Sequence, residues 1–224
     1  MQFLSVGGYC QVAHQIQRYT GCKTSSPFDW LVSPIDGTIK IIEDDGEGLA
    51  RDVKTRSNGK SAICARYGVS YHHEFIRDKD GLVVFSVEAL LSTRAKLLHK
   101  LRNFRAQARM GPVTFIRFGT FAHSADANPY LADEPMPFSK LNALAVALEA
   151  MSRDFRLAVV NHDSIWPLHA DVALDERIDL HRIEVSESGT WEGDDAQWDA
   201  ILGQYAPRPD KARKVRGAYV RQEA

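Results

Sequence analysis

The sequences VTFIRF, at residues 113–118, and FRLAVVN, at residues 155–161, are short runs rich in β-branched and aromatic residues, as buried strands are. A segment with apolar residues at helical spacing precedes each run, over Glu88–Arg109 and Phe138–Arg153 respectively. Helices that alternate with buried strands are typical of α/β layering. We therefore expect a single domain of the α/β or α+β class, in which helices flank a central mixed sheet.

The N-terminal segment predicts a strand, a tight turn and a helix. Gln2–Val6 is a short apolar run, and Gly7-Gly8 breaks it. Helical spacing of apolar residues follows from Cys10 to Arg18, with Gly21 as the predicted C-cap. This pattern predicts that Cys10 lies on the first turn of a helix.

Shorter elements complete the prediction. The sequence predicts further strands at Ala62–Tyr67, Val69–His73, Leu82–Val87 and Leu180–Val185, and short helices that begin at Ser33-Pro34 and near Asp194. Gly119–Pro137 predicts a long irregular loop, and loops of this length are often functional. In an enzyme this loop could act as a lid.

The composition is that of a globular chain. It has 224 residues, of which 44% are hydrophobic and 25% charged, and a chain of this length buries a sizeable core. Lysine and arginine number 28, against 29 for aspartate and glutamate, so no global basic field attracts nucleic acid or an anionic membrane. We expect one catalytic-type domain over residues 1–206. Residues 207–224 predict a basic, flexible tail, which could contact a polyanion weakly.

The sequence indicates neither membrane insertion nor a disulfide framework. No apolar run reaches the roughly 18 residues of a transmembrane helix, and the opening MQFLSV lacks the basic leader of a signal peptide. Cys10, Cys22 and Cys64 are odd in number and irregularly spaced, which predicts neither disulfides nor a metal site. We therefore expect a cytoplasmic protein that uses no metal and no cofactor.

Cys10 is the strongest candidate for chemistry. At a helix N-terminus the macrodipole and the free N–H groups favour a thiolate and lower the pKa of a thiol, and the thiolate is the nucleophile. Gly7 and Gly8 would let the chain turn sharply and let a substrate approach the backbone closely. The N–H of Cys10 could then stabilise an oxyanion. Alternatively, Cys10 is a small buried residue that packs against the sheet.

Three histidines are candidates for the base that would serve Cys10. His72 and His73 end a predicted strand, where side chains alternate between faces, so only one of them can point toward Cys10. His162 follows a buried strand, at the sheet edge where α/β sites form. Each could instead be a surface or loop histidine, and the residues alone do not choose between them.

Asp29, Trp30 and Arg117 are candidates for supporting roles. Asp29 lies between two aromatic residues and could fix the tautomer of a catalytic histidine, or accept hydrogen bonds in a turn. Trp30 could contact substrate or hold its loop in the core. Arg117 is a charge within an apolar strand, so it could bind a substrate carboxylate or form a structural ion pair.

Four segments resemble a bacterial family of predicted papain-like cysteine peptidases, once classed as a domain of unknown function. They are Ser5-Val6-Gly7-Gly8-Tyr9-Cys10, Pro27-Phe28-Asp29-Trp30, Tyr71-His72-His73-Glu74-Phe75 and Phe115-Ile116-Arg117. The later Trp191-Glu192-Gly193 and Trp198 are also similar to the end of that family. The resemblance spans roughly residues 3–205.

The resemblance implies a papain-like fold with a Cys–His dyad or triad. Cys10 matches the nucleophile. His73 matches the family's histidine better than His72, because an acidic residue follows it. Asp29 matches a family aspartate, to which we assign a catalytic role by inference. Glu74 stands where the family has aspartate, and the histidine is doubled, so the choice of histidine stays open.

The implied activity is that of a cysteine hydrolase of the peptidase or amidase type. Cys10 would attack a carbonyl, His73 would protonate the leaving group, and water would release the acyl group. Its substrate would be a peptide, an amide or another acyl compound. One alternative is an acyltransferase or transglutaminase-like enzyme that uses the same dyad. The other is a non-catalytic binding domain whose aromatic loop recognises a partner.

Overall fold

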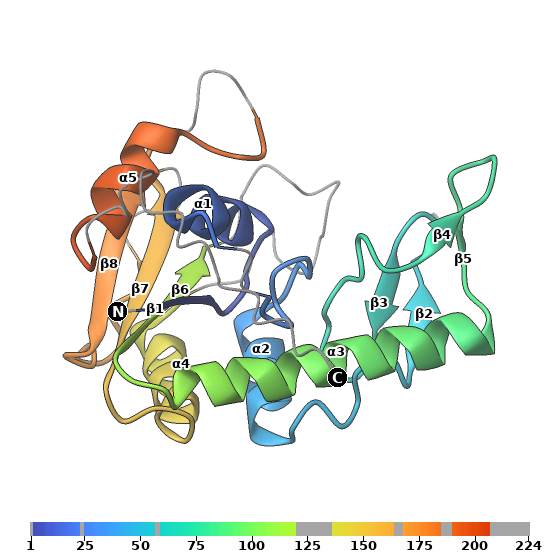
Figure 1. Ribbon diagram of the computed structural model, residues 1–224, viewed down its shortest axis with the longest axis horizontal. Helices are drawn as coiled ribbons and strands as arrows, with labels where there is room; N and C mark the ends of the chain where they lie inside the picture. The colour runs from blue at the N-terminus through green and yellow to red at the C-terminus, as the bar shows by residue number, and fades with distance from the viewer. Residues whose placement is uncertain are drawn as a thin grey trace, which may run out of the picture.

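A four-stranded parallel sheet forms the centre of the protein (Figure 1). The computed structural model describes residues 2–22, 25–56, 59–119, 136–163, 168–184 and 190–206. In spatial order the strands of the sheet are β1 (Gln2–Ser5), β6 (Val113–Phe118), β7 (Phe155–His162) and β8 (Ile178–Ile183). All three neighbouring pairs are parallel, with Phe115 of β6 opposite Leu4 and Leu157.

Helices cover both faces of this parallel sheet, as is usual for parallel sheets. Every residue of β6 is buried, as expected of a strand with helices on either side. The antiparallel pairing expected of a mixed sheet occurs in two separate two-stranded sheets. They consist of β2 (Val53–Thr55) with β3 (Ala62–Cys64), and β4 (Ile76–Arg77) with β5 (Val83–Val84).

Two helices pack on one face of the sheet and three on the other (Figure 1). The first face carries α1 (Gln11–Thr20) and α5 (Asp195–Leu202), whose apolar residues share a core with Phe118 and Val160. The second face carries α2 (Ile35–Glu43), α3 (Val87–Ala108) and α4 (Phe138–Glu149). This layering confirms the predicted α/β class.

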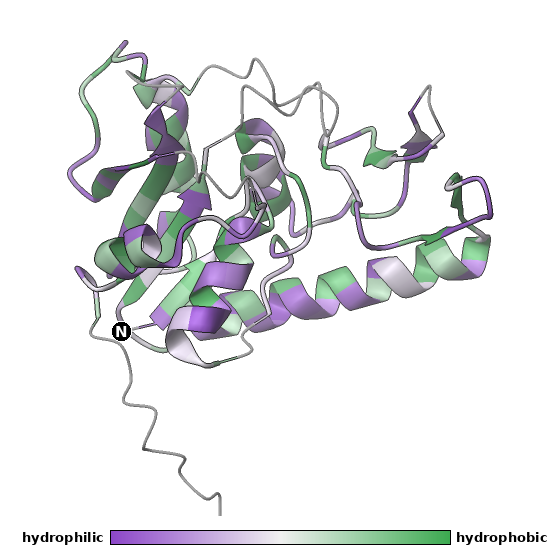
Figure 2. Cartoon of the chain, turned by 90° about the horizontal axis from the view of Figure 1, so that it is seen from above, coloured by the Kyte–Doolittle hydropathy of each residue, from purple (hydrophilic) through white to green (hydrophobic). Residues whose placement is uncertain are grey.

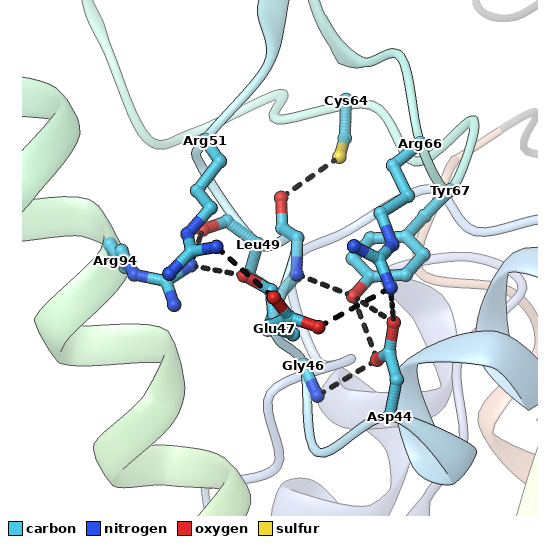
Figure 3. A network of polar contacts seen from close by, with 10 residues as sticks. Asp44, Gly46, Glu47, Leu49, Arg51, Cys64, Arg66, Tyr67 and Arg94 are labelled. Carbon is cyan, nitrogen blue, oxygen red and sulfur yellow. Dashed lines mark hydrogen bonds and ion pairs between the residues drawn. The ribbon is translucent and has the colours of Figure 1, made fainter.

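Helix α3 extends past the central sheet to the two small sheets (Figure 1). Its N-cap, Ser86, accepts a hydrogen bond from the Ala89 amide through Oγ at 3.2 Å. Both polar and apolar residues lie along α3 (Figure 2). Farther along the helix, Arg94 donates to the carbonyls of Glu47 and Leu49, each at 2.7 Å (Figure 3). These bonds join α3 to the segment that follows α2.

The segment after α2 is held by a polar network (Figure 3). The Tyr67 hydroxyl donates to the Asp44 carboxylate at 2.7 Å and accepts from the Gly48 amide at 2.6 Å. Arg66 forms an ion pair with the same carboxylate at 2.7 Å. The network lies between α2 and β3, so it fixes the position of the chain that leads to the two predicted histidines.

Several predicted boundaries are corrected. Val69–His73 is not a strand: only Ser70 makes isolated bridges, to Val32 and Ile63, before the chain bends. Helix α2 takes Pro34 as its N-cap rather than Ser33, because the Ser33 hydroxyl accepts a hydrogen bond from the Gly8 amide.

The other differences concern the short strands and the long loop. The sequence missed β2 and β4, and the strands predicted at Ala62–Tyr67 and Leu82–Val87 are shorter than expected. Residues 120–135 of the predicted loop lie outside the described residues, as does the predicted tail from residue 207. Among the described helices, none is both long and apolar enough to cross a membrane.

Candidate active site

Cys10 lies where β1 gives way to helix α1. It is the N-cap residue of the helix, with φ −59° and ψ −24°, and its carbonyl accepts from the His14 amide at 3.2 Å. Only 6% of the residue is exposed. The prediction that Cys10 lies at the start of a helix is confirmed, and the structure places it after the carboxyl end of β1 in the parallel sheet.

Gly7 and Gly8 allow the chain to pack closely on itself. Their φ values are +82° and +92°. A Cβ atom on Gly8 would lie 1.9 Å from the Phe118 carbonyl oxygen, and one on Gly7 would lie 2.2 Å from Ser33 Oγ. The Gly8 and Gly7 amides donate to the Ser33 and Ser5 hydroxyls at 3.1 and 3.3 Å. Both amides thus bind hydroxyls within the protein, and the expected approach of a substrate to the two glycines stays a prediction.

His73 lies next to the cysteine sulfur. Its Nε2 lies 3.9 Å from Cys10 Sγ, in the segment between the bridge residue Ser70 and β4. The next residue, Glu74, has a side chain that is 4% exposed and forms an ion pair with Lys96 of α3. The pairing fixes the histidine segment to the long helix.

A cavity of about 300 Å³ opens beside the Cys10–His73 pair. Its lining consists of Tyr9, Cys10, Trp30, Val32, His72, His73 and Trp191. The Trp30 ring meets the His73 ring edge to face, with centroids 5.6 Å apart. Sequence reasoning missed Tyr9 and Val32 as lining residues, and nothing in their local pattern distinguishes them from core positions.

Helix α1 also positions Trp191. The Gln15 side chain donates from Nε2 to the Glu192 carbonyl at 2.7 Å. A Cβ on Gly193 would lie 1.7 Å from Gln11 Nε2, so this turn rests directly on the helix. Trp191 in turn packs against the His14 ring, at a centroid distance of 5.3 Å. The similarity of Trp191-Glu192-Gly193 to the end of the family indicated neither this contact nor a cavity wall.

Asp29 is buried below the aromatic loop that contains Trp30. It is 3% exposed, and its Oδ2 accepts from the Ser26 amide at 2.7 Å. Between these described residues and His73 there is no hydrogen bond that would complete a triad. Burial raises the pKa of Asp29 to about 7, against the lowering effects of the Ser26 amide and the Lys100 charge.

Arg117 is fully buried and binds the protein backbone. Its guanidinium donates to the Val6 carbonyl at 3.2 Å, the Ser33 carbonyl at 3.0 Å and Thr38 Oγ1 at 3.3 Å. These bonds join the end of β1 to the start of α2. Arg117 is not among the described residues that line the cavity, and its expected contact with substrate stays a prediction.

Of the other two predicted histidines, His72 lines the cavity and His162 does not. His162 is buried at the end of β7, with its ring edge-on to Phe118 at 5.4 Å. The His72 ring lies next to the His73 ring at 4.7 Å, and partial desolvation and the neighbouring His73 lower the pKa of His72. Of these three histidines, His73 is therefore the one whose ring contacts the Cys10 sulfur.

The pKa of Cys10 moves opposite to the expected direction. Burial raises it to about 11, the nearby Asp29 charge adds to the increase, and the backbone N–H of Cys10 opposes it. Desolvation thus outweighs the helix N-terminus, and Cys10 rests as a thiol at neutral pH. A proton must leave the sulfur before it can attack.

The other two cysteines lie apart from this cavity. Cys64 is buried, and its thiol donates to the Gly48 carbonyl at 3.5 Å (Figure 3). Cys22 is exposed, and all three cysteines are free thiols. Within the described ranges, no cluster of three or more histidine, cysteine, aspartate or glutamate residues could hold a metal ion.

Fold and cavity together define an α/β protein with a cysteine–histidine pair at one edge of a parallel sheet. The chain belongs to the family described as "Putative papain-like cysteine peptidase", whose profile matches residues 1–164. The predicted resemblance is thereby confirmed. No curated protein and no solved structure matches the chain.

Proposed function

We propose that the protein is a cysteine hydrolase of the peptidase or amidase type, in which Cys10 is the nucleophile and His73 its acid–base partner. The observation that carries this proposal is the 3.9 Å separation of Cys10 Sγ and His73 Nε2 at a cavity of about 300 Å³. Catalytic hydrogen bonds are often this long before substrate binds. Membership of the papain-like family supports the same class of reaction.

The raised pKa of Cys10 makes His73 a general base in this mechanism. As Sγ attacks the carbonyl carbon, the thiol proton passes to His73 Nε2 and the carbon–sulfur bond forms. The amides of Gly7 and Gly8 already bind hydroxyls, so we assign the Cys10 backbone N–H as an oxyanion donor. His73 then protonates the leaving amine, and water hydrolyses the thioester.

The remaining candidates support the site from outside it. Asp29 holds the aromatic loop through the Ser26 amide, and Arg117 holds the junction of β1 and α2. We propose both as positioning residues. Trp30 and Trp191 belong to the cavity itself, so we assign them to the binding of the acyl substrate.

The test measures hydrolysis of a panel of fluorogenic N-acyl amides by the full chain. We expect turnover that Cys10→Ser and His73→Ala abolish and that His99→Ala leaves unchanged, because His99 lies on α3 and bonds to Asn103. Product analysis with an added primary amine separates the two acyl-transfer activities. Free acid as the main product supports a hydrolase, whereas an amide of the added amine would indicate a transferase. Turnover that survives Cys10→Ser would overturn both.

A further inference from the structure

Aromatic rings dominate the wall of the cavity beside Cys10. Tyr9, Trp30 and Trp191 contribute three such rings, and Val32 adds an aliphatic surface. The two indole rings lie edge to face, at a centroid distance of 6.5 Å and an interplanar angle of 60°. They come from the loop before α2 and from the turn before α5, so two distant segments of the chain build one apolar wall.

The described residues that line the cavity carry no charge of fixed sign. Among the described residues that line it, there is no aspartate, glutamate, lysine or arginine. The ionisable groups at the wall are Tyr9, Cys10, His72 and His73. Burial raises the pKa values of Tyr9 and Cys10, and desolvation lowers that of His72. A charged group entering this space would lose water without gaining a counter-charge from the described side chains that line it.

The volume suits one ring-sized group. A cavity of about 150 Å³ lined by apolar side chains is enough to bind benzene. The cavity beside Cys10 measures about 300 Å³, which leaves room for a ring and the few atoms that connect it to a carbonyl. A long peptide would have to lie outside it.

We propose that this cavity binds an aromatic group that the substrate carries next to the carbonyl attacked by Cys10. This inference rests on the proposed function and specifies the class of its substrate. Aromatic pairs prefer edge-to-face geometry, and the Trp30 ring already makes such a contact with His73. Rings can also bind quaternary ammonium groups, but none of the described residues that line the cavity adds a carboxylate to pair with such a cation.

The test measures equilibrium binding to the full-length Cys10→Ala variant, so that no reaction at sulfur is needed. The probes are N-benzylacetamide, N-isobutylacetamide and N-(2-trimethylammonioethyl)acetamide, and the readout is tryptophan fluorescence. We expect N-benzylacetamide to bind about tenfold more tightly than the other two, or ~1.4 kcal/mol. On the same background Trp191→Ala should remove this preference. Leu91→Ala should keep it, because Leu91 is an exposed residue of α3.

A second variant tests the ring itself. Trp191→Leu keeps an apolar side chain and should still lose the preference for the benzyl probe, while circular dichroism reports whether the fold is intact. Equal affinity for all three probes, or tighter binding of the cationic one, would overturn the inference. Because binding is measured without Cys10, it can succeed where the proposed hydrolase fails. Conversely, an active hydrolase without aromatic preference would refute this inference alone.

Discussion

At the scale of single residues, the close packing of Gly8 governs where Cys10 lies. A Cβ on Gly8 would overlap the Phe118 carbonyl oxygen at 1.9 Å, and its φ of +92° is unfavourable for other residues. The C-cap Gly21 has a similar φ of +69°, but a Cβ there would have no neighbouring atom within 4 Å. An alanine at Gly21 would therefore introduce backbone strain alone, whereas an alanine at Gly8 would add steric overlap to the strain.

We predict that Gly8→Ala destabilises the protein by about 3 kcal/mol or more, since it combines strain with overpacking. Gly21→Ala should lower the free energy of unfolding by only about 1 kcal/mol, because strain acts alone. Urea unfolding of the two variants checks this. Equal effects of the two substitutions would show that the contact with Phe118 is not rigid.

The raised pKa of Asp29 predicts that the stability of the protein depends on pH. Its pKa is raised from 3.8 to about 7 in the folded protein, so the folded state keeps this proton at pH values where the unfolded state has lost it. The free energy of unfolding should therefore fall as pH rises from about 4 to about 7. Each pKa unit corresponds to about 1.4 kcal/mol, so the contribution amounts to a few kcal/mol.

Asp29→Asn removes this titration and keeps an acceptor for the Ser26 amide. The variant should gain stability relative to the parent as pH rises through that window, and turnover at neutral pH should stay within about tenfold. Loss of a triad aspartate costs about 10⁴ in kcat. A loss of that size in Asp29→Asn would restore the triad assignment, and thermal unfolding at pH 5 and pH 8 tests the stability part.

At the scale of elements, helix α3 positions the histidine segment. Glu74 is the next residue after His73, and its buried carboxylate pairs with Lys96. We predict that Glu74→Gln slows acylation of Cys10 by about tenfold or more, since small displacements of a catalytic group have large effects. A matched control is Glu149→Gln, which breaks an exposed ion pair with Arg177. An unchanged acylation rate in Glu74→Gln would show that α3 does not position His73.

The elements also show how far the sequence predicts the structure. The sequence predicts strands β6 and β7 from their runs of β-branched and aromatic residues. It predicts helices α3 and α4 from apolar residues at helical spacing. The small strands β2 and β4 were missed because they are three and two residues long, and four of these five residues are exposed. Cys10 and Trp30 were found from local motifs.

Other parts of the site depend on contacts that no local pattern reveals. Trp191 reaches the cavity only because its turn packs on Gln15, far away in the sequence. The raised pKa of Cys10 likewise follows from burial by the assembled fold. From the position of Cys10 at a helix N-terminus alone, we predicted a lowered pKa for its thiol.

At the scale of the whole molecule, residues beyond the family match belong to the same folded unit. The profile ends at residue 164, yet Trp198 of α5 is fully buried and stacks on Phe118 at a centroid distance of 6.0 Å. We predict that Trp198→Ala lowers the free energy of unfolding by about 3–5 kcal/mol. Trp191→Ala, at a residue that is 42% exposed, should lower it by less than about 1 kcal/mol. If the two variants lost comparable free energy of unfolding, the assignment of Trp198 to the core and of Trp191 to the cavity wall would be contradicted.

The most direct test of the account follows the acylation of Cys10 by an activated ester, with intact-protein and peptide mass spectrometry in a Cys22→Ser background. We predict a single acyl group on Cys10, formed at neutral pH at a rate that His73→Ala lowers by about 10²-fold or more, the usual contribution of a general base. An acyl group found elsewhere, or an acylation rate that does not depend on His73, would contradict the account.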